Sequence, residues 1–156
     1  MIHAPQPNSF IKVPGIEKAG ITIDMIAAGV AYTYEILDAI DEKLLASGAF
    51  RLAKLIELAN LSSVIGNLLG SGIARASEGV FQRNGPHKYP DLLAEQPNAQ
   101  DIEIKMALED NKPKGHLAKP GYYLICRYVL CDDSGRNNNS QVWLNGLWDC
   151  CTKAPS

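Results

Sequence analysis

Asp101-Ile-Glu-Ile-Lys-Met-Ala-Leu108 is the stretch that decides how this sequence folds. Side chains of an extended strand alternate between its two faces. The apolar positions would share one face and the charged positions the other: Ile102, Ile104, Met106 and Leu108 against Asp101, Glu103 and Lys105. We therefore expect a strand with one face in a hydrophobic core, and with a carboxylate beside an amine on its opposite face.

The residues before this strand carry helical periodicity. From Asp24 to about Ser47, apolar residues recur at three- and four-residue steps, which predicts an amphipathic helix that ends at Gly48. Either Thr22 or Asp24 would cap its first turn. Residues 1–23 are rich in proline and glycine, and we expect them to form an irregular arm.

A second helical pattern runs from about Phe50 to Ala76 and is apolar over much of its circumference. This pattern predicts the most buried helix of the protein. Its glycines, Gly66, Gly70 and Gly72, allow two outcomes. They would either let a sheet approach the helix closely or break the helix into two pieces.

Short extended runs replace the helical pattern after Gly79. We expect strands at residues 80–82, 88–93, 101–108, 122–130 and 142–148. Helices followed by strands predict an α+β or α/β fold in which the N-terminal helices pack on a sheet. A single domain is therefore expected over residues 1–156, with an arm at 1–23, a helical part at 24–76 and a sheet at 79–148.

Composition limits the class of protein. At 156 residues the chain is one domain in length, and a hydrophobic content of 46% with 21% charged residues argues against disorder over most of it. The formal net charge of −2 does not identify a nucleic-acid binder. Phosphate contacts depend on local charge, however, and residues 112–128 carry Lys112, Lys114, Lys119 and Arg127 with no acidic residue.

Targeting signals and cysteine chemistry give no strong lead. The N-terminus has no basic-then-apolar run, and no apolar run reaches the roughly 20 residues that cross a bilayer, so we expect a cytoplasmic protein without membrane contact. The four cysteines lack the two-residue spacing of most structural zinc sites, which favours free thiols: Cys126, Cys131, Cys150 and Cys151.

A further carboxylate, that of Asp91, lies in the sequence Tyr89-Pro-Asp91, ten residues before the 101–108 strand. If Asp91 lies on a neighbouring strand and faces the same side, two carboxylates and a lysine converge. Asp91, Glu103 and the main-chain carbonyl of Ile104 would then hold Mg²⁺, with Mn²⁺ as a substitute. Lys105 would orient the attacking water or neutralise developing charge. This chemistry hydrolyses phosphodiesters.

Pro90-Asp91 and Glu103-Ile104-Lys105 resemble the paired motif of the PD-(D/E)xK nuclease superfamily, over roughly residues 50–130. The resemblance implies a restriction-endonuclease-like mixed sheet flanked by helices, and magnesium-dependent cleavage that leaves a 5′-phosphate. It implies DNA as the substrate of a type II restriction-like endonuclease, with a DNA-repair nickase or a junction resolvase as alternatives. Cutting both strands of a duplex calls for two active domains, so we expect a homodimer.

Many members of that superfamily also carry an acidic residue on the helix before the motif. Glu57, on the second predicted helix, and Glu78, just before the first strand, are both candidates for this catalytic role, and Glu57 is preferred. For each of them, a solvated surface charge or a helix-end residue is at least an equal alternative.

Basic and polar residues near the motif are candidates for contacts with DNA. They lie in the loop beyond the 101–108 strand and beside Asp91: Lys112, Lys114, His116 and Lys119, together with Arg83, Asn84 and Lys88. A solvated loop explains the lysines equally well. A non-catalytic DNA-binding or assembly module on a nuclease-like scaffold is therefore the alternative function.

Overall fold

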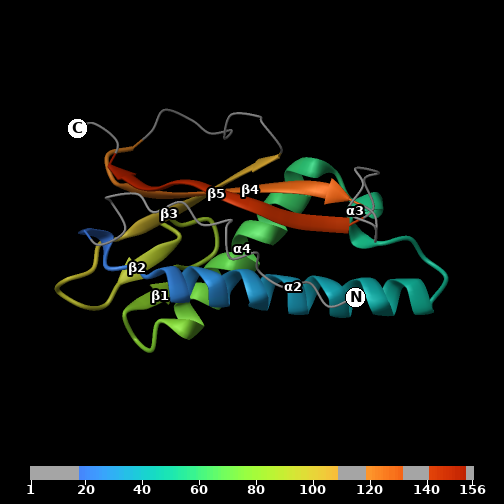
Figure 1. Ribbon diagram of the computed structural model, residues 1–156, viewed down its shortest axis with the longest axis horizontal. Coiled ribbons are helices and arrows are strands. Elements are labelled where there is room, and N and C mark those ends of the chain that lie inside the picture. Colours follow the sequence, from blue (N-terminus) through green and yellow to red (C-terminus); the bar gives the residue numbers. More distant parts are fainter. Residues whose placement is uncertain (1–17, 109–118, 132–140, 154–156) are drawn as a thin grey trace.

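The computed structural model describes residues 18–108, 119–131 and 141–153, with the backbone alone for residue 131 and residues 141–153 (Figure 1). The fold is of the α+β class, with a five-stranded mixed sheet in the order β1-β2-β3-β4-β5. The strands are β1 (Phe81–Arg83), β2 (Leu92–Ala94), β3 (Ile102–Leu108), β4 (Tyr122–Cys131) and β5 (Gln141–Lys153). β3 and β4 are parallel, and every other neighbouring pair is antiparallel. The predicted neighbours of the 101–108 strand are thus confirmed.

The first predicted helix is confirmed as α2 (Ile23–Ala46). Thr22 caps it, because its hydroxyl oxygen accepts a hydrogen bond from the Met25 N–H at 3.1 Å. The helix ends at Ser47, and Gly48 follows with a φ of 80°, a conformation that favours glycine. Among the described residues no helix is both long and apolar enough to cross a membrane.

The second predicted helical stretch, from about Phe50 to Ala76, is interrupted, but not at its glycines. The chain forms α3 (Leu52–Leu55), becomes extended at Ile56 and then forms α4 (Leu58–Ala76). The Asp41 carboxylate of α2 accepts a hydrogen bond from the Leu52 N–H at 2.8 Å, which ties the start of α3 to α2. This tertiary contact sets where α3 begins, and the break falls before the glycines.

The glycines lie at close approaches inside the continuous α4. A Cβ atom at Gly72 would lie 2.8 Å from the Cα of Gly29, where α2 crosses α4 (Figure 1). The neighbours at the other two glycines are side chains of the sheet: Met106 at Gly66, and Arg83 and Ile104 at Gly70. The glycines therefore bring α2 and the sheet close to α4 without breaking the helix.

The second strand is shorter than predicted. The sequence pattern predicts an extended run over residues 88–93, whereas β2 begins only at Leu92. Pro90 has no N–H for a ladder, and the side-chain amide of Asn84 donates to the Pro90 carbonyl at 2.8 Å. Asp91 consequently lies immediately before the strand. At the other end of the sheet, β5 runs to Lys153, beyond the predicted limit of residue 148.

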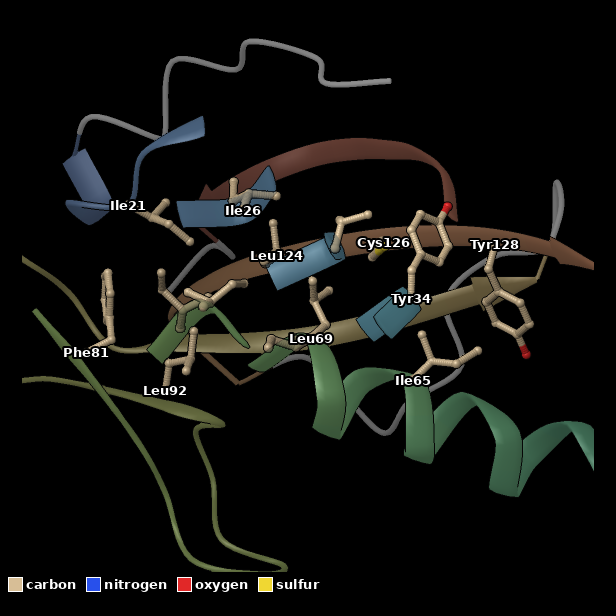
Figure 2. Close-up of a cluster of buried hydrophobic side chains, with 14 of the residues drawn as sticks. Ile21, Ile26, Tyr34, Ile65, Leu69, Phe81, Leu92, Leu124, Cys126 and Tyr128 are labelled. Atoms are coloured by element: carbon tan, nitrogen blue, oxygen red, sulfur yellow. The ribbon is translucent and has the colours of Figure 1, made fainter. Parts of the chain in front are cut away.

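The core lies between α4 and the sheet, with α2 packed against α4. Ile65 and Leu69 of α4 gather with Leu124 and Cys126 of β4 (Figure 2). On β3, Ile102 and Ile104 are buried as predicted, whereas Met106 and Leu108 are only partly buried. Cys126 is a buried free thiol, and burial raises its pKa to about 12.

Candidate functional site

Asp91, Glu103 and Lys105 lie together at the edge where β2 begins. Leu92 of β2 pairs with Ile102 of β3, so Asp91 lies beside Glu103. The Asp91 Oδ2 accepts a hydrogen bond from the Ile104 N–H at 2.8 Å, and the Lys105 Nζ donates to the Glu103 Oε1 at 2.9 Å. Glu103 and Lys105 thus meet on one face of β3, as the alternating pattern predicts.

The Asp91 carboxyl is in an environment that disfavours its charge. Burial is the largest cause that raises its pKa above the ordinary value, and the neighbouring Glu103 raises it further through charge and a hydrogen bond. The Ile104 N–H and the positive charge of Arg83 act in the opposite direction. Two carboxylates held this close repel each other, so positive charge placed between them would be stabilised.

Arg83 supplies one positive charge from β1. Its Nη1 donates to the main-chain carbonyl of Asp91 at 3.3 Å and lies 3.7 Å from the Asp91 Oδ1. Its Nη2 donates to the Asn67 Oδ1 of α4 at 3.1 Å. A Cβ atom at Gly70 would lie 2.6 Å from the Arg83 Nη1, so this glycine leaves the room in which the guanidinium lies.

The donors for a divalent cation are Asp91, Glu103 and the main-chain carbonyl of Ile104. In a strand, the N–H and C=O of one residue point to the same side. Since the Ile104 N–H points to Asp91, its carbonyl faces that edge as well. No group of three or more His, Cys, Asp or Glu side chains suited to a metal occurs in the part of the chain that is described. Two carboxylates and one carbonyl fit Mg²⁺, which usually keeps several water ligands.

Two pockets meet at the carboxylates. The first, which we call the helix–strand slot, lies between α4 and β3, has a volume of about 430 Å³, and is lined by Leu58, Ala59, Ser62, Gly66, residues 104–108 and Tyr128. The second, the hairpin groove, has a volume of about 460 Å³ and is lined by Arg83 and the turn at residues 84–89. Ser63, Asn67, Asp91 and Glu103 line both.

The structure does not bring the predicted acidic helix residue to the site. Glu57 is the exposed N-cap residue of α4, and Glu78 is exposed beyond the other end of that helix. Both lie outside the two pockets. From α4, Ser63 and Asn67 line both pockets together with the carboxylates instead. Their four-residue spacing, on the side of the helix that carries Gly66 and Gly70, is the signal that could have identified them.

The predicted DNA-contacting residues divide into three groups. Arg83, Asn84 and Lys88 line the hairpin groove. Lys119 is exposed, and its Nζ lies 4.4 Å from the centre of the Tyr89 ring. Lys112, Lys114 and His116 lie outside the described residues.

Tyr89 connects the hairpin to the start of β4. Its hydroxyl donates to the Pro120 carbonyl at 3.4 Å. Burial, followed by a hydrogen bond with Tyr123, raises the pKa of Tyr89 to about 12. The hairpin therefore reaches the strand on the far side of β3, beside the site.

The chain matches no protein-family model, and no curated protein or solved structure gave a significant match.

Proposed function

We propose that this protein is a magnesium-dependent DNA endonuclease of the PD-(D/E)xK superfamily, with a restriction-endonuclease-like fold. The observation that carries the proposal is the meeting of Asp91, Glu103 and Lys105 at one end of β2. Three antiparallel strands followed by a parallel one, with α4 packed beside them, support it. The type II restriction-like reaction, the homodimer and the cytoplasmic location are parts of the same proposal.

Asp91 and Glu103 would hold the cation, with the carbonyl of Ile104 as a third ligand. Bound Mg²⁺ would supply Lewis acidity and a water molecule with a lowered pKa, and Mn²⁺ would substitute for it. Asp91 is kept in position by the Ile104 N–H and by Arg83. The Lys105 side chain is 32% exposed, so its amine can reach a phosphate in the slot, where it would offset the negative charge of the transition state.

The hairpin groove is the surface that fits the DNA backbone next to the cut. Arg83 and Lys88 bring positive charge to it, and Asn84 and Tyr89 bring hydrogen-bonding groups. Phosphate contacts of this kind weaken steeply as salt concentration rises. Binding through this groove should therefore be strongly dependent on salt.

Plasmid cleavage tests the proposal. Supercoiled DNA is incubated with Mg²⁺ and with wild type, Asp91→Asn or Lys105→Ala. The matched control is Lys43→Ala, which removes an exposed lysine in the last turn of α2. We expect nicking by wild type and the control, and a loss of roughly 10²-fold or more in the two site variants.

The absence of cleavage by wild type over plasmid, single-stranded DNA and RNA would refute the nuclease proposal, and so would variants that cut as fast as wild type. The alternative function, a non-catalytic DNA-binding module, predicts DNA binding without turnover. It also predicts no heat of Mg²⁺ or Mn²⁺ binding that depends on Asp91 and Glu103.

A further inference from the structure

The helix–strand slot differs in chemistry from one end to the other. Its inner end holds Asp91, Glu103 and Lys105. Away from them its walls are mainly apolar or small: Leu58, Ala59 and Gly66 of α4 face Met106 and Leu108 of β3. A hydrated cation needs only the inner end, so the remaining space is available to another group.

Paired hydroxyl groups line the apolar part of the slot. The Ser62 Oγ and the Tyr128 hydroxyl are 2.7 Å apart; Tyr128 is fully buried, whereas Ser62 is half-buried. With Tyr128 as its fixed partner, the Ser62 hydroxyl keeps hydrogen-bonding capacity for a ligand. A volume of about 430 Å³ with apolar walls and a few fixed polar groups is typical of a small-molecule site.

The two pockets differ in charge. Among the described residues that line the slot, Lys105 is the sole cation, and it lies at the carboxylate end. The hairpin groove carries Arg83 and Lys88, with His87 beside them. A nucleic-acid strand alternates anionic phosphates with uncharged nucleosides. With one phosphate at Asp91 and Glu103, the next phosphate fits the groove, and a nucleoside fits the slot.

We infer that the helix–strand slot receives one nucleoside of the substrate, unstacked from its neighbours, directly beside the phosphate that is cut. The inference rests on the proposed function and refines its substrate. Neighbouring bases cover both faces of a base that is stacked in a duplex. The slot has one wall from a helix and one from a strand, so a base must leave the stack before these walls can contact its two faces. Enzymes that take a base out of the stack hold it between apolar side chains and hydrogen-bond its edge. Here Leu58 and Met106 provide the walls, and Ser62, held in place by Tyr128, provides a hydrogen bond.

Binding of a mononucleotide tests this inference without requiring turnover. Amide chemical shifts of the full chain are followed with Mg²⁺ and either deoxyadenosine monophosphate or inorganic phosphate. We expect the nucleotide to shift residues along the slot, including Ala59, Ser62 and Leu108. Inorganic phosphate should shift only the carboxylate end. Equal footprints for the two ligands would overturn the inference.

Two variants make the test specific. Ala59→Leu places a larger side chain in the slot from an exposed position on α4, so the fold should be preserved. Ala31→Leu is the matched control, because Ala31 is exposed on α2. We expect Ala59→Leu to weaken nucleotide binding at least tenfold without changing phosphate binding, and Ala31→Leu to change neither. Unchanged nucleotide binding in Ala59→Leu would overturn the inference.

The plasmid assay separates the two proposals. Cleavage by wild type together with identical footprints for nucleotide and phosphate would overturn the slot inference and leave the nuclease standing. A nucleotide-specific footprint in a protein that cuts no nucleic acid would support the slot as a nucleoside site and refute the nuclease.

Discussion

Gly70→Ala should reduce cleavage while leaving the protein folded. The new Cβ would lie 2.6 Å from the Arg83 Nη1 and 3.0 Å from the Ile104 Cδ1. Both atoms are at the ends of flexible side chains, so the guanidinium can move instead of the backbone. In moving, it would lose its contacts with Asp91 and with Asn67.

Opposing effects set the expected change in stability. Alanine favours a helix interior over glycine by about 1 kcal/mol. The Arg83–Asp91 ion pair is about a quarter exposed and contributes up to ~1 kcal/mol. The free energy of unfolding should therefore change by less than ~1 kcal/mol, or by at most about 4 °C in the midpoint temperature. Gly66→Ala is the stability control, because its nearest neighbour is the flexible Met106 at 3.3 Å and it leaves Arg83 in place.

Losing ~1 kcal/mol of support for Asp91 in the transition state would slow cleavage about fivefold. The assay measures single-turnover cleavage over a range of Mg²⁺ concentrations, beside urea unfolding of each variant. Arg83→Ala should show at least as large a loss, since it also removes a cation from the hairpin groove. The double variant should lose little more than Arg83→Ala alone, because both changes remove the same contact with Asp91. The affinity for Mg²⁺ should not weaken, since a positive charge has left Asp91.

Restoration of the full rate of Gly70→Ala by more Mg²⁺ would refute this reasoning, because Arg83 would then act on metal binding and not on the position of Asp91. Additive losses in the double variant would refute it as well.

Three further predictions concern stability. Burial raises the pKa of Asp91 above its ordinary 3.8, so the folded state is most favoured with this carboxyl protonated and loses stability as pH rises through the raised pKa. In metal-free buffer at neutral pH, Asp91→Asn should therefore unfold at a higher urea concentration than wild type, and the difference should vanish below pH 3.8. Gly72→Ala would bring its Cβ to 2.8 Å from the backbone of Gly29, and thermal unfolding should show a net loss of about 1–2 kcal/mol after the gain in helix propensity. Asp41→Ala should cost about 1–2 kcal/mol in the same assay, because the Leu52 N–H loses its acceptor.

The periodic spacing of apolar residues predicted the helix and the strand that turn one regular face to the core. The alternation over residues 101–108 predicted β3 and, from Ile102 to Lys105, its buried and charged faces; beyond Lys105 burial shifts to Ala107. The three- and four-residue steps predicted α2 to within two residues. Both patterns record which side of one element faces the core. That information is local, so a single sequence contains it.

The start of α3, just before the interruption at Ile56, depends on a contact between residues far apart in the sequence. Asp41 accepts from Leu52, eleven residues away, and no local pattern at residues 50–57 marks that bond. The same break explains Glu57. In one continuous helix this residue could have faced the sheet, but as the N-cap of α4 it is exposed.

The position of Arg83 depends equally on packing. Its sequence neighbours predict a cation at a turn, available to DNA. Its contact with Asn67, sixteen residues earlier, exists only because α4 passes close to β1 at Gly70. The same side chain therefore supports Asp91 and also lines the hairpin groove.

Asp91 and Glu103 are not brought together in the way that the alternating pattern predicts. The sequence pattern predicts Asp91 on a paired strand, whereas β2 pairs with β3 through Leu92 and Ile102 alone. Two residues further along each strand, Ile104 would face Pro90, whose carbonyl already accepts from Asn84. The Asp91 carboxylate takes the vacant acceptor position at the Ile104 N–H. The last hydrogen bond between β2 and β3 is thus made to the Asp91 side chain and not to the main-chain carbonyl of Pro90. This bond places the carboxylate beside Glu103.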